Sequence, residues 1–392
     1  MLGGLSAFAP LATDMYLPAM PRLERVFATD AARVQWTLAA FFLGFALGQA
    51  FYGAIADRYG RKPSLYAGLV LYIGASVGCA LAPGIGLLAA LRFLEAIGAC
   101  AGAVIARAVV SDLFTGQEAA RLFAALMAVM GIGPIIAPLI GGYLLLWFDW
   151  QAVFWVLAAF GVACLLAVWL RLPETHRPET VRSLALVSVT TRYLMLLVDR
   201  RYLGYALSAA LGMAGLFAYI AGSPFVFITL HRLTPQHYAW LFGANAFGIV
   251  LASRVNHALL RRYSADALLV GANLAQVAAG VLLLAAAATG EGGAPGLAAP
   301  LFLYVACVGI VMPNSVALAM APHRHAAGVA SALLGVLQFS LAAAAAALIG
   351  ALHSGGALPM AALILAFGLL SFGLRYLLVG RVARGAGKGP LK

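Results

Sequence analysis

The stretch GAIADRYGRKPSL, Gly53–Leu65, joins two long apolar runs and combines one carboxylate, three cations and two glycines. Gly60 permits a tight turn, and Gly53 allows a second helix to approach closely. Asp57 is placed to cap a helix or to pair with a basic group. The cations, which would hold the loop at an anionic membrane surface, are Arg58, Arg61 and Lys62. The stretch therefore predicts a short, charged turn between two membrane-spanning helices.

The composition around this loop is that of an integral membrane protein. Hydrophobic residues make up 64% of the 392 residues, charged residues make up 10%, and the mean hydropathy is +0.98. No soluble fold of this length could bury so much apolar surface. Runs such as Leu65–Leu81 and Leu268–Ala288 are apolar on every side and do not alternate as barrel strands do. The sequence predicts an all-α bundle that crosses the membrane.

Twelve apolar runs of membrane-spanning length predict twelve transmembrane helices. We place them at residues 3–24, 33–56, 64–82, 86–110, 121–147, 151–170, 202–230, 237–259, 265–288, 297–320, 326–352 and 357–380. The long polar stretch 171–201 contains LPETHRPET, whose two prolines disfavour a helix. We therefore expect an N-terminal six-helix half at 1–170, a cytoplasmic linker at 171–201, and a C-terminal six-helix half with a short basic tail at 202–392.

The formal net charge of +12 is explained by topology, because the cations concentrate in alternate loops. Basic residues follow the second, sixth and eighth runs and fill the tail, whereas Asp149 and Glu291 mark loops of the other parity. The first loop is an exception, because it carries Arg22, Arg25 and Arg33 beside Glu24 and Asp30. The positive-inside rule places both termini and the linker in the cytoplasm. The lipid bilayer is then the partner of the basic residues, and we expect no nucleic-acid partner.

Metal binding and ATP hydrolysis have no support in the sequence. The four cysteines are scattered singly through apolar runs, without a CxxC pair or a histidine set at ligand spacing, so we predict no metal site. They are Cys79, Cys100, Cys164 and Cys307. No GxxxxGK[ST] loop occurs, which disfavours ATP-driven pumping.

A weak internal repeat supports the division into halves. Gly44–Leu65 aligns without a gap on Gly248–Leu269, with Gly44 on Gly248 and Ala54 on Ala258. Asp57 meets Arg261 in this alignment, so the loop chemistry is intact only in the first half. Duplication followed by decay of the second copy explains the pattern.

Three motifs resemble the major facilitator superfamily. Gly53–Leu65 resembles its signature loop between the second and third helices, and MGIGPIIAPLIGGYL, Met130–Leu144, is similar to the fifth-helix motif of its antiporters. The small and helix-weakening residues of that second motif suit a rocking interface; they are Gly133, Pro134, Pro138, Gly141 and Gly142. Ala12–Pro21 and Arg92–Asp112 together resemble the bicyclomycin and chloramphenicol resistance branch, in which position 95 is more often glutamine.

This resemblance implies a monomeric transporter, not an enzyme, in the bacterial inner membrane. It would be driven by the proton gradient without another cofactor and would export lipophilic, cationic or neutral drugs.

Buried charges are the candidates for the mechanism, because an ionised group near mid-bilayer is costly unless it is paired or hydrated. Asp14 falls about half a membrane thickness from the start of the first run. Arg92 and Glu95 share a helical face, either as a static pair or as part of the site, and we expect Arg92 to lie near Asp14. Arg107 and Asp112 fall near the inner end, where Arg107 either functions or snorkels to the headgroups.

Other side chains are candidates for the walls of a central cavity. Asn245 either lines the cavity or bonds between helices. The aromatic candidates, which would line the cavity or face lipid, are Tyr16, Trp36, Phe41, Tyr219 and Phe225.

The sequence therefore predicts a proton-coupled antiporter that exports small drug-like molecules by alternating access. Asp14 is the first candidate for carrying the proton and Glu95 the second. Two alternatives stay open: a proton-coupled transporter of a single metabolite, and a membrane receptor that transports nothing. The sequence does not identify the substrate.

Overall fold

The computed structural model describes residues 1–175 and 193–386, and every regular element in these two ranges is helical. The first half contains α1 (Leu2–Ser6), α2 (Phe8–Asp14), η1 (Leu17–Ala19), α3 (Met20–Val26), α4 (Ala31–Tyr59), α5 (Arg61–Ala80), α6 (Ile85–Leu113), α7 (Gly116–Trp147) and α8 (Gln151–Arg171). The second contains α10 (Arg200–Pro224), η3 (Phe225–Leu230), α11 (Pro235–Leu259), α12 (Ala265–Thr289), α13 (Gly293–Met320), η4 (Ala321–Ala326), α14 (Ala327–Ala351) and α15 (Leu358–Ala386). Most of the predicted linker and the end of the basic tail, including Arg182, Lys388 and Lys392, fall outside the described residues.

The first membrane segment is broken, whereas the sequence predicted one helix over 3–24. Its breaks follow from its prolines, because proline has no N–H to donate to the carbonyl four residues earlier and its ring clashes there. Pro10 removes the bond to Ser6, where α1 ends, and Pro18 removes the bond to Asp14, where α2 ends. Asp14 therefore lies at a helix end in the interior of the protein.

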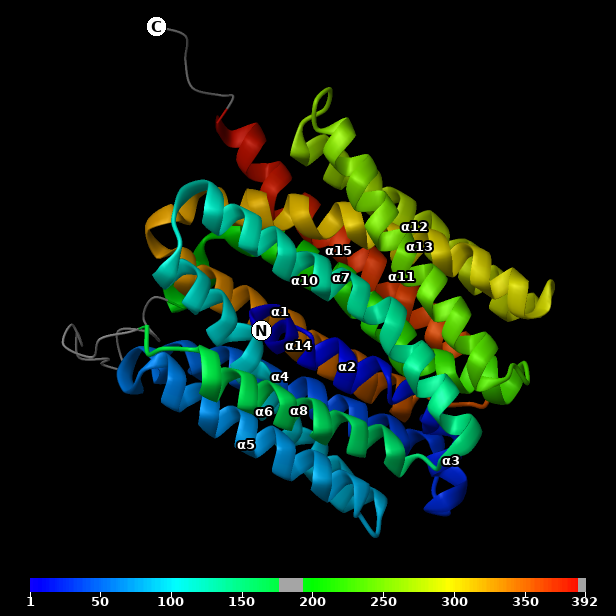
Figure 1. Cartoon of the computed structure of the whole chain (residues 1–392). Coiled ribbons are helices and arrows are strands. Elements are labelled where there is room, and N and C mark those ends of the chain that lie inside the picture. The colour runs from blue at the N-terminus through cyan, green and yellow to red at the C-terminus, as the bar shows by residue number, and fades with distance from the viewer. Residues whose placement is uncertain (176–192, 387–392) are drawn as a thin grey trace, which may run out of the picture.

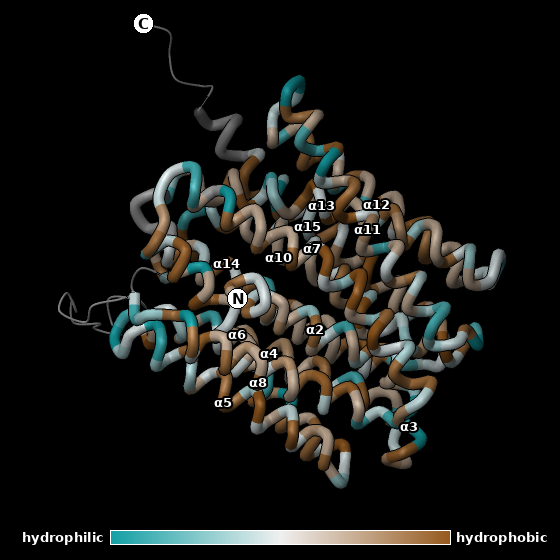
Figure 2. The backbone as a smooth tube through the Cα atoms, in the orientation of Figure 1, coloured by the Kyte–Doolittle hydropathy of each residue, from teal (hydrophilic) through white to brown (hydrophobic). Residues whose placement is uncertain are grey.

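Ten helices of the described chain are long and apolar enough to cross a membrane. The broken first segment and α11, which is 25 residues long and carries several polar residues, complete the twelve segments predicted from the sequence. Figure 2 shows hydrophobic residues along the helices and hydrophilic residues gathered near their ends. Large apolar side chains such as Trp169 and Leu170 are more than half exposed, which suits contact with lipid.

The two halves pack mainly within themselves and meet through two pairs of long helices. In the first half α6 packs on α4 and α5, and in the second half α13 packs on α11 and α12. Gly44 presses α4 against α6, and Gly248 presses α11 against α13, so the aligned glycines of the repeat make corresponding contacts. Between the halves, α4 packs on α14 and α7 packs on α11. In Figure 1 α1 and α2 of the broken first segment lie in the middle of the molecule, with α4, α5, α6 and α8 on one side of them.

Candidate transport site

Asp14 is buried between the halves without an ion partner. Its side chain is at most 4% exposed, and no described cation lies within 4.0 Å of its carboxylate. It lies within electrostatic reach of Tyr219 on α10 and Tyr238 on α11. The segment that follows, η1, contacts both of those helices. Asp14 therefore belongs to the first half by sequence and faces the second half in space.

Arg92 pairs with Glu95 instead of with Asp14. Arg92 Nη1 lies 2.6 Å from Glu95 Oε2, and both side chains are fully buried. The hydroxyl of Ser76 on α5 donates to Glu95 Oε1 at 2.8 Å. Both carboxylate oxygens thus have donors. Arg92 and Glu95 share a face of α6, as expected, and form an ion pair within that helix.

Aromatic rings from three segments surround the Arg92 guanidinium. Its Cζ lies 4.3 Å from the ring centre of Phe41, 4.8 Å from that of Tyr16 and 5.7 Å from that of Phe154. The Tyr16 hydroxyl bonds to Thr37 at 2.7 Å, which fixes this ring against the cation. Cation–π contacts partly replace the lost hydration of a buried guanidinium. Tyr16 and Phe41 therefore belong to the interior of the first half, and neither is left exposed.

The second half contributes a neutral polar cluster opposite Asp14. Asn245 Nδ2 donates to the Tyr219 hydroxyl at 2.9 Å, and Ser223 bonds to the Tyr238 hydroxyl at 2.8 Å. The Tyr219 ring is stacked on Phe242 with the ring centres 5.4 Å apart. Asn245, predicted either to line a cavity or to bond between helices, makes a bond between α11 and α10. Tyr238 and Ser223 were not singled out from the sequence, which carries no local pattern that marks them.

Two other aromatic candidates lie near the end of the halves opposite to the loop Gly53–Leu65. Trp36 on α4 is 57% exposed, and Phe225 at the start of η3 is buried. Phe225 packs edge-on against His353, with the ring centres 5.8 Å apart.

The charged loop is organised around Arg61. This side chain is nearly buried and binds two carboxylates, Asp57 at 2.6 Å and Asp112 at 2.9 Å. Asp112, predicted as a charge near the inner end, therefore joins the loop network. Gly60 has a φ of 94°, a backbone conformation that favours glycine.

The remaining loop residues lie at the edge of this network. The Arg58 guanidinium lies 5.3 Å from the ring centre of Tyr59, and the Lys62 ammonium lies 5.7 Å from that of Tyr66. A Cβ added at Gly53 would meet no heavy atom of the described residues within 4 Å, so the expected close helix contact at this glycine is wrong. The close approach of α4 occurs at Gly48, where a Cβ would lie 2.6 Å from Cys100 on α6.

Glu174 completes the loop network and was missed from the sequence. Its carboxylate accepts the backbone N–H groups of Arg61 and Lys62, both at 3.0 Å, and so satisfies two donors at the start of α5. The sequence offered one sign of this role, because Glu174 is the first carboxylate of LPETHRPET and comes just after α8. In the sequence alone this carboxylate looks like part of the polar linker. Arg107 lies apart from this network in the described structure, half-buried, with its Nε donating to the Ala103 carbonyl at 3.0 Å.

Three glycines of α7 form close contacts with other segments. A Cβ at Gly133 would lie 2.9 Å from Pro10, and a Cβ at Gly141 would collide with the backbone of Met15. On the adjacent position, a Cβ at Gly142 would lie 3.0 Å from the Pro235 carbonyl of α11. Pro134 and Pro138 lie inside α7, which continues through both. The predicted motif thus packs α7 against the first segment and against the second half.

Comparison with known proteins gives the same architecture. Residues 2–347 match the model of the Major Facilitator Superfamily. A Bacillus subtilis protein described as the uncharacterized MFS-type transporter YdgK is 35% identical over 372 residues, covering 93% of this chain and 90% of the relative. The bicyclomycin resistance protein homolog of Haemophilus influenzae is 29% identical over 361 residues, covering 92% and 90%. The chloramphenicol resistance protein of Pseudomonas aeruginosa is 28% identical over 340 residues, covering 85% and 78%.

Solved structures agree with this fold. The xylose transporter XylE from E. coli, in a partially occluded inward-open conformation, superposes with a TM-score of 0.72 at 15% identity, covering 96% of this chain and 95% of that one. A bacterial homolog of the human lysosomal transporter Spinster also gives 0.72, at 16% identity, covering 98% and 96%. The match of residues 2–347 to the superfamily model, with which the twelve helical segments and the loop built around Arg61 agree, shows that the chain belongs to the major facilitator superfamily.

Proposed function

We propose that this transporter is a proton-coupled antiporter that exports small drug-like molecules, and that Asp14 carries the coupling proton. The observation behind the proposal is the position of Asp14: a buried carboxylate without an ion partner, held by the first half and facing the second. Buried ionisable groups without a partner are costly in a membrane and are usually functional.

The surroundings of the two carboxylates favour Asp14 over Glu95 as the group whose affinity for a proton changes between the inward-facing and outward-facing states. Glu95 is bonded to Arg92 and Ser76, which belong to the same half. A rocking motion of one half against the other would leave those bonds intact. The tyrosines near Asp14 belong to the other half, so the same motion would change its surroundings, and a carboxylate's affinity for a proton follows its surroundings.

The cycle follows from this difference. With the site open to the outside, the drug leaves and Asp14 takes up a proton. With the site open to the cytoplasm, Asp14 releases the proton and a drug binds in its place. The proton gradient then drives export, and no further cofactor is needed. We place the protein in the bacterial inner membrane as a monomer, with both termini cytoplasmic because of the basic loops.

The substrate class is supported by the relatives. Two of them are named for resistance to bicyclomycin and to chloramphenicol. The polar groups of the second half near Asp14 are neutral hydroxyls and an amide that lie among aromatic rings. Such a surface suits neutral or cationic lipophilic compounds.

The decisive experiment measures proton release when substrate is added to purified protein in weakly buffered detergent. Wild-type protein should release protons, and Asp14→Asn should release none, because the amide neither gains nor loses a proton in this pH range. Glu95→Gln is the matched control and should still release protons. Undiminished release from Asp14→Asn would move the coupling role away from this residue.

A drug-susceptibility panel in an efflux-deficient bacterial host identifies the substrate for the proton-release experiment. Resistance to several unrelated lipophilic compounds supports multidrug export. Transport of one metabolite alone would favour the single-substrate alternative, and vesicles that show no proton-coupled flux for any compound would favour a receptor.

A further inference from the structure

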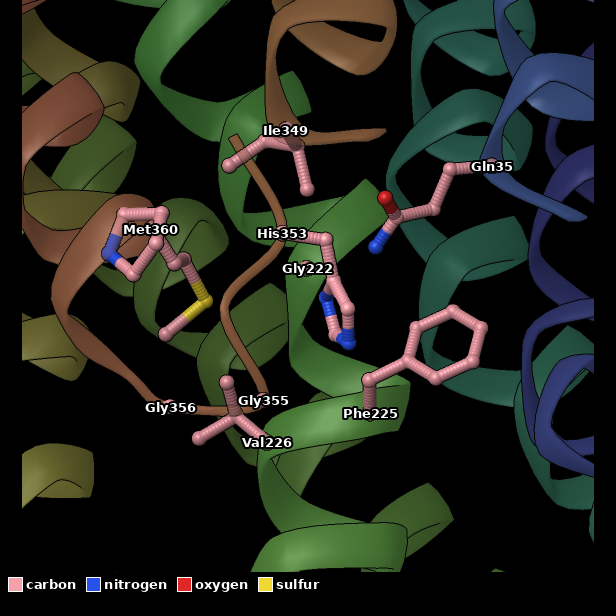
Figure 3. A pocket seen from close by; sticks show the side chains of 10 residues that line it. Gln35, Gly222, Phe225, Val226, Ile349, His353, Gly355, Gly356 and Met360 are labelled. Atoms are coloured by element: carbon pink, nitrogen blue, oxygen red, sulfur yellow. The ribbon is translucent and has the colours of Figure 1, made fainter. Parts of the chain in front are cut away.

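A small cavity lies where α4 meets the second half, at the opposite end of these helices from the Arg61 loop. It has a volume of about 20 Å³, room for about one water molecule. Gln35 of α4 lines it from the first half, and the other lining residues belong to the second half, among them Gly222, Phe225, Ile349 and His353. Figure 3 shows the Gln35 side chain and the His353 imidazole on the same side of the cavity, with the amide nitrogen nearer to the ring than the amide oxygen in this view.

The Gln35 amide reaches from the first half to the second, but only its nitrogen has a hydrogen-bond partner. Its side chain is fully buried, and its Nε2 donates to the Ala221 carbonyl of α10 at 3.4 Å. Its Oε1 is buried and has no donor within the described chain. A buried acceptor without a donor costs about 1–3 kcal/mol, so the position favours an additional donor in the cavity.

His353 is the titratable group that lines this cavity. It follows α14 in an exposed turn, so protons outside the cell reach it when this end faces outward, as in the proposed orientation. Along α4 the nearest charged residues in sequence are Asp30 and Arg33, which pair with each other at 3.9 Å. Beyond η3 come His231 and Arg232, while α14 after Gly328 and the outer half of α15 carry no charged residue.

We propose that this cavity is an external proton-binding site, in which protonated His353 donates to Oε1 of Gln35, directly or through one water molecule, and holds the outer ends of the halves together. Histidine ordinarily changes charge between about pH 5 and 8. The protonated ring donates from both nitrogens, so one donor can serve Gln35 while the other faces solvent. Neutral imidazole keeps one N–H, so removing the proton weakens this bond by taking away its charge.

The site works beside the coupling carboxylate and does not depend on it. The adjoining contacts are already close, because a Cβ at Gly350 on α14 would lie 3.1 Å from the Ala32 carbonyl of α4. A charge-assisted bond at this point adds to a closed interface and favours the state that faces the cytoplasm. External acid would thus speed the return of the emptied transporter, whatever group carries the coupling proton.

The test measures the distance between the outer ends of the two halves by pulsed electron paramagnetic resonance of two spin labels. The labels are attached at Leu81→Cys and Glu291→Cys, which are exposed positions in opposite halves, after the four native cysteines are replaced by alanine. Asp14→Asn is included in every sample, so that protonation of Asp14 contributes nothing. The ratio of closed to open outer ends should rise about tenfold between pH 8 and pH 5.5, the size expected for one charge-assisted hydrogen bond.

Three variants decide the assignment. His353→Asn and Gln35→Met should each remove the pH response, and combining them should remove no more than either one does. His231→Asn is the matched control, a histidine of the same half that does not line the cavity, and should keep the full response. A response that survives in His353→Asn, or that disappears in His231→Asn, overturns the proposal. The proton-release experiment uses protein that retains Asp14, whereas every spin-labelled sample carries Asp14→Asn. If Asp14 does not carry the coupling proton, only the proton-release result changes, and the distance measurement still tests His353.

Discussion

At the scale of single residues, the Arg92–Glu95 pair shows how one substitution changes a buried site. The resistance branch that the sequence resembles more often carries glutamine at position 95, whereas this chain places a carboxylate against the guanidinium at 2.6 Å. The carboxylate neutralises Arg92 inside the first half. Removing one partner of a buried pair typically costs about 3–5 kcal/mol, because the other charge is left without compensation.

We therefore expect Glu95→Ala to lower the thermal stability of the purified protein strongly and Glu95→Gln to lower it less. Glutamine keeps an acceptor for Arg92 and a polar group for Ser76, although it removes the charge. Melting curves in detergent measure the difference. Equal melting temperatures for all three proteins would contradict a stabilising role for the pair.

Asp57 is predicted to act on switching and not on substrate binding. It pairs with Arg61, and Asp112 holds the same guanidinium from the C-terminal end of α6, about 25 Å along that helix from Glu95. Asp57→Asn should reduce transport turnover while leaving substrate affinity within about twofold, because the loop sets the balance between states. Asp30→Asn is a suitable control, since Asp30 pairs with a cation and caps a helix at the other end of α4. A large loss of affinity in folded Asp57→Asn would exclude this role.

At the scale of elements, α7 is the helix that links the first segment to the second half. Its Gly141 lies against the backbone of Met15, one residue after Asp14. Backbone cannot move aside as a side chain can, so an added methyl group must displace α7 or the broken segment.

Gly141→Ala should therefore impair transport and cost about 1–3 kcal/mol of stability, the usual cost of overpacking. Gly53→Ala provides the control, because a Cβ there meets open space in the described structure. Transport assays in cells, normalised to the amount of protein in the membrane, measure both. Normal transport by Gly141→Ala would show that this contact is not needed for switching.

At the scale of the whole molecule, the orientation in the membrane decides the direction of transport. We expect Arg58→Cys to react with an impermeant thiol reagent only after the cells are opened, and Glu291→Cys to react in intact cells. Both positions are exposed, whereas Arg61 is too buried to serve as a reporter. The reverse labelling pattern would overturn the orientation and the proposal of export.

The sequence alone determined the class and the family, because the properties that decide them are local. Runs of apolar residues have the length of a membrane, and the turn at Gly60 with its carboxylate and cations lies within one short stretch. The breaks in the first segment were also within reach of the sequence, since Pro10 and Pro18 remove specific backbone bonds.

Only the tertiary structure decided which groups meet. Arg92 pairs with Glu95 and not with Asp14, Glu174 reaches the start of α5 across more than a hundred residues, and Tyr238 lies near Asp14 from the other half. Hydropathy places a residue at a depth in the membrane, but it leaves undetermined the rotation of each helix and the neighbour that each face meets. Those are set by side-chain packing between helices, such as the contacts at Gly48 and Gly141, and they decide whether a buried charge is neutralised within one half or exposed to the motion of the other.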